Sequence, residues 1–153
     1  MANTFSQIYI QTVFVVSGRD SLIRPEFKEE LYKYITGIVR NDGHKLISIN
    51  GMPDHVHILI GLKPAMALSD LVRDIKADSS NSINKNKWVR GKFSWQEGYG
   101  AFSYGHSQLD TIIRYIQNQE RHHQRRSFKS EYLSFLRKFD IAFEDKYVFE
   151  FIE

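Results

Sequence analysis

Cysteine and long apolar runs are missing from this chain. The absence of cysteine excludes a disulfide scaffold, a thiolate metal site and a cysteine nucleophile. Only three prolines and nine glycines occur in 153 residues, and no linker-like stretch divides them, so we expect a single domain over residues 1–153. No apolar run approaches the roughly 20 residues of a membrane span, and Met1–Phe5 has no signal-peptide character. These absences predict a cytoplasmic protein with no membrane partner.

Positive charge is unevenly distributed along the chain. The formal net charge is +3, but residues 140–153 hold five acids and one base, so residues 1–139 carry +7. Most of this excess lies in two segments without acids, 84–92 and 121–129. Their basic residues are Lys85, Lys87, Arg90, Lys92, Arg121, Arg125, Arg126 and Lys129. Such clusters are typical of surfaces that bind nucleic acid, although a solvated charged face has the same composition.

The pattern of apolar residues predicts an alternation of strands and helices. β-Branched and aromatic residues favour strands, and apolar residues three and four apart favour helices. Strands are expected at residues 9–16, 45–50, 55–62, 93–96 and 101–104, and helices at 25–41, from Ser69 onward, at 107–124 and at 128–139. The order β-α-β-β-α-β followed by helices indicates an α+β fold of the ferredoxin-like, split βαβ type. Such a fold has an antiparallel sheet with helices on one face.

Two histidines lie close together in the strand expected at 55–62. Successive side chains in a strand point to opposite faces, so His55 and His57 share one face while Val56 and Ile58 can enter the core. The two histidine Cα atoms would lie roughly 7 Å apart, which lets both imidazoles converge on one metal ion. Two ligands do not complete a site, and the same pattern also fits a pair of histidines on a half-solvated sheet face.

The helix expected at 107–124 supplies a second polar pair. Tyr115 and Gln119 are four residues apart and therefore lie on one helix face, at the border of its apolar stripe. Two imidazoles and an amide oxygen could hold a divalent ion that polarises a phosphodiester, and a nearby tyrosine could attack the phosphorus. His122 continues the same stripe, where it would contact DNA, tune the site or remain solvated. Taken alone, Tyr115 could equally be a tyrosine without a catalytic role, at the edge of the apolar helix face with its ring packed and its hydroxyl in solvent.

Several short motifs occur in a characteristic order along the chain. His55-Val56-His57 matches the HUH motif, in which two histidines flank a hydrophobic residue, and Tyr115–Gln119 matches a Y-x-x-x-Q helix motif. The spans 52–57, 96–103, 118–123 and 128–132 add to the likeness. Together these motifs resemble the single-tyrosine HUH transposases of bacterial insertion sequences, the insertion sequence 200/605 family, over nearly the whole chain.

The resemblance implies a mechanism and a set of residue roles. His55, His57 and Gln119 would bind Mg²⁺ or Mn²⁺. Tyr115, on a C-terminal catalytic helix, would cleave single-stranded DNA, stay joined to the 5′ side through a phosphotyrosine and leave a free 3′-hydroxyl. The resemblance also implies recognition of hairpin ends and a homodimer, in which the helix that carries Tyr115 can complete the partner's site.

The resemblance gives the basic segments a use. Lys85, Lys87, Arg90, Lys92, Arg121, Arg125 and Arg126 would contact DNA phosphates. Trp88, Phe93 and Trp95 lie in or beside the first segment, where they could stack on unpaired bases or remain in the core. The acidic tail 140–153 would pack on the partner subunit or on its own domain.

Three other functions share part of this pattern. A related HUH nuclease for replication or conjugation would use the same chemistry on different DNA. A non-catalytic ferredoxin-like nucleic-acid-binding module would bind DNA with salt sensitivity but would not cut it. A metallohydrolase that uses His55 and His57, with zinc for example, would turn over without a covalent intermediate.

Overall fold

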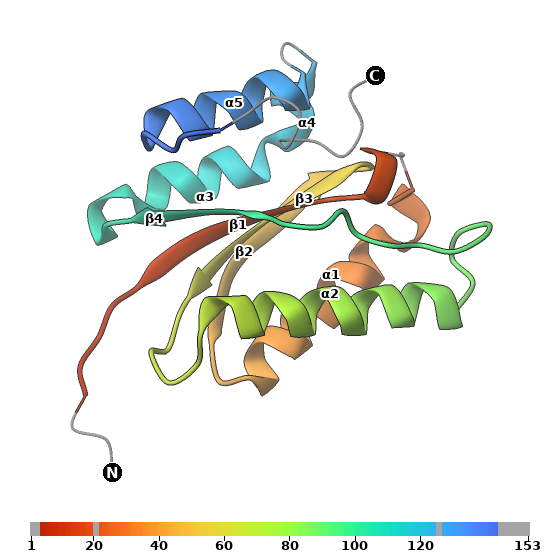
Figure 1. Cartoon of the computed structure of the whole chain (residues 1–153), viewed down its shortest axis with the longest axis horizontal. Coiled ribbons are helices and arrows are strands. Elements are labelled where there is room, and N and C mark those ends of the chain that lie inside the picture. Colours follow the sequence, from red (N-terminus) through yellow and green to blue (C-terminus); the bar gives the residue numbers. More distant parts are fainter. Residues whose placement is uncertain (1–3, 20–21, 125–126, 144–153) are drawn as a thin grey trace.

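The computed structural model describes residues 4–19, 22–124 and 127–143, apart from the side chain of His122. Within these ranges the chain forms four strands and five α-helices, with two short 3-10 turns (Figure 1). The bounds are β1 (Tyr9–Val15), η1 (Ser17–Arg19), α1 (Pro25–Asn41), β2 (Lys45–Met52), β3 (His55–Gly61), α2 (Leu68–Lys85), β4 (Gly100–Tyr104), η2 (His106–Gln108), α3 (Leu109–Gln117), α4 (Gln119–His123) and α5 (Phe128–Lys138).

The four strands form one antiparallel sheet in the order β2-β3-β1-β4. β2 and β3 are a hairpin, and β1 pairs with β3 along its whole length. This order confirms the predicted ferredoxin-like, split βαβ fold. The hairpin is tight at its turn: the two strands approach so closely that a Cβ atom on Gly51 would collide with the backbone of His55 and Val56. Glycine at this position therefore lets the start of β3 lie directly against the end of β2.

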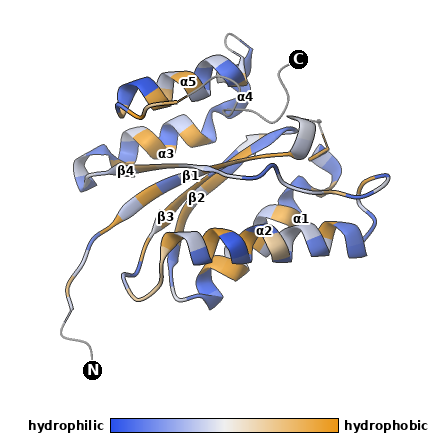
Figure 2. Cartoon of the chain, in the orientation of Figure 1, coloured by the Kyte–Doolittle hydropathy of each residue, from blue (hydrophilic) through white to orange (hydrophobic). Residues whose placement is uncertain are grey.

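One face of the sheet is covered by α1 and α2 (Figure 1). α1 begins at Pro25 as expected, since the first helical residue needs no N–H donor. The core on this face consists of apolar side chains, among them Phe14, Val56, Ile58 and Ile60 from the strands and Leu31, Ile35, Leu71 and Ile75 from the helices. Apolar and hydrophilic residues alternate along α1 and α2 (Figure 2), so each helix buries one stripe.

The opposite face is covered by α3 and α5 (Figure 1). Aromatic rings dominate this second core, where Phe102 of β4 stacks on Phe135 of α5 with centroids 5.0 Å apart. The sequence predicted helices on one face and a separate catalytic helix; the structure adds that α3 and α5 pack over the second face. His55 and His57 are consequently buried between sheet and helices, and the alternative of a half-solvated histidine pair is wrong.

Several element boundaries differ from those predicted. The helix expected at 107–124 is interrupted at Asn118 and forms α3 and α4. α2 starts at Leu68 with Ala67 as its N-cap, one residue before Ser69. The strand expected at 93–96 contributes only an isolated bridge between Trp95 and Val16. Of the acidic tail, the part after Phe143 lies outside the described residues.

Helix length and hydropathy also bear on the membrane prediction. Among the helices in the described ranges, none combines the length and the apolar character that crossing a membrane requires.

Candidate active site

β3 presents the two histidines to the face that carries α3 and α5. His55 lies opposite Val15 of β1, and His57 lies opposite Val13, so both stand on an interior strand of the sheet. Both side chains have no solvent-exposed surface. The alternation predicted from the sequence holds, because Val56 and Ile58 enter the other core. The two imidazole centroids are 5.2 Å apart.

Each imidazole is oriented by a hydrogen bond at Nδ1. The Nδ1 atom of His55 lies 2.7 Å from Oδ1 of Asp54, and that of His57 lies 2.7 Å from Oε1 of Gln11. Gln11 is itself held in place, since its Nε2 donates to the hydroxyl of Tyr104 over 2.9 Å. Both partners of Nδ1 are oxygen acceptors, so each neutral ring carries its proton on Nδ1. The lone pairs of both Nε2 atoms then point toward α4 and α5.

The break between α3 and α4 positions the tyrosine and the glutamine. Asn50 of β2 donates from Nδ2 to the carbonyl oxygens of Ile116 and Gln117, at 3.0 and 3.1 Å. These bonds satisfy carbonyl groups that the end of α3 leaves without helical partners. The chain then restarts as α4 at Gln119, whose Oε1 lies 3.1 Å from Nε2 of His55. Gln119 is fully buried.

α5 places a carboxylate in the middle of this cluster. The helix begins at Phe128 and is capped by Ser127, whose hydroxyl accepts from the N–H of Ser130. One turn into the helix, Oε1 of Glu131 lies 3.3 Å from Nε2 of His57 and 3.7 Å from Nε2 of His55.

The other carboxylate oxygen faces the tyrosine. Oε2 of Glu131 accepts a hydrogen bond from the hydroxyl of Tyr115 and lies 3.3 Å from Nε2 of Gln119. A third imidazole completes the surroundings, because Nε2 of His123 lies 3.3 Å from Oε1 of Glu131. Tyr115 is thus beside the histidines of its own chain, with its ring 5.9 Å from that of His57.

Burial alters the acidity of the central carboxylate. The Glu131 side chain is 3% exposed, and burial raises its pKa to about 7, while His55 acts to lower it and Asp54 to raise it further. Aromatic rings close the cluster from outside: Phe128 stacks on His55 at 3.9 Å between centroids, and Phe135 lies 5.6 Å from Tyr115. The cluster is therefore a polar pocket inside an aromatic shell.

The donor set fits a small divalent cation. Nε2 of His55, Nε2 of His57, Oε1 of Gln119 and an oxygen of Glu131 converge, and the two imidazoles and the carboxylate each offer an atom within 4.8 Å of the other two. Amide and carboxylate oxygens suit Mg²⁺ and Mn²⁺, and imidazole nitrogens suit transition-metal ions such as Zn²⁺ and Fe²⁺. Neighbouring ligands of an octahedral ion at roughly 2.1 Å lie about 3 Å apart, close to the 3.1 and 3.3 Å separations in this cluster.

The predicted DNA-binding cations within the described ranges are exposed, unlike the buried cluster. Lys85, Lys87, Arg90, Lys92 and Arg121 are exposed, whereas Arg125 and Arg126 lie outside the described residues. The segment 85–92 follows α2 and is tied to the start of α1 by a hydrogen bond from the guanidinium of Arg24 to the carbonyl oxygen of Trp88.

The aromatic residues of this region mostly belong to the core. Phe93 and Trp95 are 1% and 8% exposed, so of the two positions that the sequence left open, base stacking or the core, both residues occupy the core. Trp88 is half-buried and stacks on Phe27 of α1 with centroids 5.0 Å apart.

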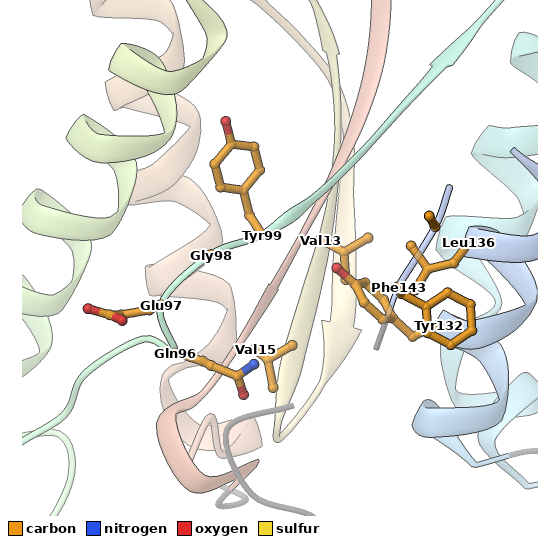
Figure 3. Close-up of a pocket in the computed structure, with 10 residues that line it drawn as sticks. Val13, Val15, Gln96, Glu97, Gly98, Tyr99, Tyr132, Leu136 and Phe143 are labelled. Carbon is orange, nitrogen blue, oxygen red and sulfur yellow. The ribbon is translucent and has the colours of Figure 1, made fainter. Parts of the chain in front are cut away.

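A separate cavity lies on the other side of α5. It has a volume of about 370 Å³ and is bounded by Val13 and Val15 of β1, the loop 96–99, and Tyr132 and Leu136 of α5 (Figure 3). Neither histidine of the HUH motif lines it.

Sequence reasoning found His55, His57, Tyr115 and Gln119 but missed their partners. Glu131 belonged to a span, 128–132, that carried part of the family likeness, but no local spacing connects it to the histidines. His123 was passed over for His122, whose side chain lies outside the described part of the chain; the structure places Nε2 of His123 3.3 Å from Oε1 of Glu131. The remaining partners are Gln11, Asn50 and Asp54.

The chain is similar in sequence to known proteins. The sequence model of the family described as IS200-like transposase matches residues 4–119. Among curated proteins, the chain is similar to the ISDra2 transposase TnpA of Deinococcus radiodurans, at 24% identity over 120 residues that cover 74% of this chain and 84% of that protein.

Solved structures bear on the fold. The chain is similar to a protein from Deinococcus radiodurans R1 described as a transposase, with a TM-score of 0.62, 21% identity, and coverage of 78% of this chain and 95% of that one. It is also similar to a REP-associated tyrosine transposase bound to a REP hairpin, with a TM-score of 0.56, 16% identity, and coverage of 77% and 72%. Both likenesses support the α+β fold described above.

Proposed function

Because the chain belongs to the IS200-like transposase family, we propose that it cuts and rejoins single-stranded DNA through a covalent bond to Tyr115, aided by a divalent metal ion. The observation that carries the proposal is the position of the Tyr115 hydroxyl, which donates to Glu131 beside the two histidines of the HUH motif. A hydrolase that activates water would not need a tyrosine in this place.

The proposed roles follow from the contacts of each side chain. His55, His57 and Gln119 would hold Mg²⁺ or Mn²⁺, and the bound ion would act as a Lewis acid on the scissile phosphate. Asp54 and Gln11 keep both imidazoles in the tautomer whose Nε2 lone pair faces the ion.

The proposed reaction is a transesterification at phosphorus. The hydroxyl oxygen of Tyr115 forms a bond to phosphorus, and the bond from phosphorus to the 3′ oxygen of the preceding nucleotide breaks. The phenol proton passes along its existing hydrogen bond to Oε2 of Glu131, and the departing 3′ oxygen takes a proton from solvent. The phosphotyrosine ester retains the energy of the broken bond, so a 3′-hydroxyl can reverse the step and rejoin a strand.

The DNA partner and the assembly belong to the same proposal. Single-stranded DNA with hairpin ends is the proposed substrate, by analogy with the REP hairpin of the structural relative. The exposed cations at Lys85, Lys87, Arg90, Lys92 and Arg121 would contact its phosphates. We also propose a homodimer that spans two DNA ends, with Tyr115 acting in its own subunit or in the partner's; light scattering on the purified protein tests the dimer.

A covalent adduct with DNA is the test of this function. Single-stranded oligonucleotides from the DNA that flanks the gene, labelled at the 3′ end, are incubated with the protein and Mg²⁺ or Mn²⁺. The label should move to the protein on a denaturing gel, because the tyrosine keeps the 5′ phosphate of the labelled fragment. Tyr115→Phe should abolish the adduct, and a chelator should prevent it.

Tyr34→Phe is the matched control, since Tyr34 is an exposed tyrosine of α1 outside the polar cluster. This variant should form the adduct normally. An adduct that persists in Tyr115→Phe would contradict the proposed nucleophile, and cleavage without any adduct would favour a metallohydrolase instead.

A further inference from the structure

We propose that Glu131 is a ligand of the divalent ion and at the same time the residue that positions Tyr115, so that α5 joins the metal site to the nucleophile. The inference rests on the proposed function and deepens it, because it assigns a metal-binding carboxylate to a helix beyond residues 4–119, the part of the chain that the family model matches.

The first support is the arrangement of acceptor atoms around Oε1 of Glu131. The Nδ1 atoms of His55 and His57 face oxygen acceptors, so the Nε2 atoms that face Glu131 carry lone pairs. In its ionised form the carboxylate therefore places Oε1 3.3 and 3.7 Å from two lone pairs. Acceptors held this close repel one another, and a cation bound between them turns the repulsion into coordination.

The side-chain amide of Gln119 is also oriented with its acceptor toward the proposed metal position. Its Oε1 lies 3.1 Å from Nε2 of His55, while its Nε2 lies 3.3 Å from Oε2 of Glu131. The amide is thereby oriented with its oxygen toward the imidazole and its N–H toward the carboxylate. Two imidazole nitrogens, one amide oxygen and one carboxylate oxygen form a set in which only Glu131 brings negative charge.

The second support is that the two carboxylate oxygens of Glu131 contact different groups. Oε1 faces the imidazoles, and Oε2 accepts from the hydroxyl of Tyr115. Both oxygens can therefore act at once. The carboxylate is 3% exposed and sits on a capped helix, so its position is determined by packing and does not depend on a mobile side chain. A bound cation would offset the cost of burying the negative charge of this side chain.

The test is Mn²⁺ binding by the full chain without DNA. Free Mn²⁺ is titrated with protein, and the loss of the free-ion electron paramagnetic resonance signal gives the dissociation constant. Glu131→Gln keeps the size of the side chain and removes its charge. Its Mn²⁺ affinity should fall by about tenfold or more, because loss of a partner one step further from the metal already weakens metal sites by about 10- to 100-fold.

The matched control is Glu120→Gln, since Glu120 of α4 is 77% exposed in its side chain and should leave the affinity unchanged. His57→Ala should abolish binding. If Glu131→Gln fails to fold by circular dichroism, Glu131→Asp provides the second variant: it keeps the charge but withdraws the carboxylate by one methylene group, and it should also weaken binding.

Unchanged or tighter Mn²⁺ binding in Glu131→Gln would overturn the inference, because the carboxylate would then be a bystander or a competitor of the ion. The two proposals fail separately. An adduct that requires Tyr115, together with unaltered Mn²⁺ affinity in Glu131→Gln, removes only the role of Glu131. Weakened Mn²⁺ binding in that variant, with no adduct from the unmodified protein, removes only the DNA chemistry.

Discussion

The two faces of the sheet are made from the same strands but differ in what they bury. Toward α1 and α2, β3 presents Val56, Ile58 and Ile60 to an apolar core. Toward α3 and α5, the same strand presents His55 and His57, and the neighbouring elements add further buried polar groups: Gln11, Gln119 and Glu131. Burial of polar groups is costly unless each is paired. The period of two in a strand therefore lets one face supply stability while the other accommodates reactive groups.

The largest expected effect is on the apolar face. Phe14 of β1 is fully buried, with Trp95 packed edge-on at 5.9 Å between centroids and the ammonium group of Lys76 5.6 Å from its ring centre. Phe14→Ala should lower the free energy of unfolding by about 3–5 kcal/mol through lost burial and a cavity. Urea unfolding measures the change.

Tyr34→Ala is the control for this prediction, because Tyr34 is 43% exposed on α1 and should alter stability by less than about 0.5 kcal/mol. Below its own unfolding transition, Phe14→Ala should still bind Mn²⁺ with normal affinity. A large loss of Mn²⁺ affinity in the folded variant would contradict the separation of the two faces.

The second prediction compares two glycines, one for each face. A Cβ atom on Gly100 of β4 would lie 2.7 Å from the hydroxyl oxygen and 2.9 Å from a ring carbon of Tyr132, the residue after Glu131. Gly100→Ala should therefore displace α5, lower the unfolding free energy by about 1–3 kcal/mol and weaken Mn²⁺ binding.

Gly37 of α1 is the matched position on the other face. A Cβ atom there has nothing within 4 Å, so Gly37→Ala should raise stability by about 0.5–1 kcal/mol through its helix propensity. Opposite signs for the two substitutions are expected in urea unfolding. If Gly100→Ala did not lower stability, α5 would have adjusted without strain, and the link between Gly100 and the polar cluster would be lost.

The fold was predictable because each strand carries its own pattern. Alternation in residues 55–62 placed the two histidines on one face. This relation spans only a few residues, so local geometry determines it. The prediction of a continuous helix failed at Asn118, because the bonds from Asn50 to the last carbonyl groups of α3 come from a distant strand.

The partners of the histidines were beyond the reach of local patterns. Gln11 meets His57 across 46 positions of sequence, and the contact depends on the register between β1 and β3. Glu131 reaches the cluster only because α5 folds back over the second face of the sheet. A polar residue in a strand or an acid in a helix is an ordinary surface feature until tertiary packing buries it.

The smallest predicted effect is the pH dependence of stability. It tests whether a buried histidine outside the polar cluster contributes to this dependence. His44, just before β2, is 5% exposed; its Nδ1 accepts from the backbone N–H of Lys63 at 2.9 Å, and its Nε2 lies 3.3 Å from the sulfur of Met66. Burial, and to a lesser extent the charge of Lys63, lowers the pKa of His44 below its usual value of 6.5. The unfolded chain therefore binds a proton at this residue at higher pH than the folded chain does, so stability is lost as pH falls through that value.

Urea unfolding from about pH 8 to about pH 5, with Mn²⁺ in excess to occupy His55 and His57, should show this loss in the unmodified protein. His44→Gln should show less of it, since the amide oxygen can still accept from the N–H of Lys63 but does not titrate. The slope of the unfolding free energy against pH should be the same in both proteins near the upper end of the range. Below about pH 6.5 the slope should be steeper in the unmodified protein. Identical pH slopes in the two proteins would contradict a contribution of His44 to the pH dependence of stability.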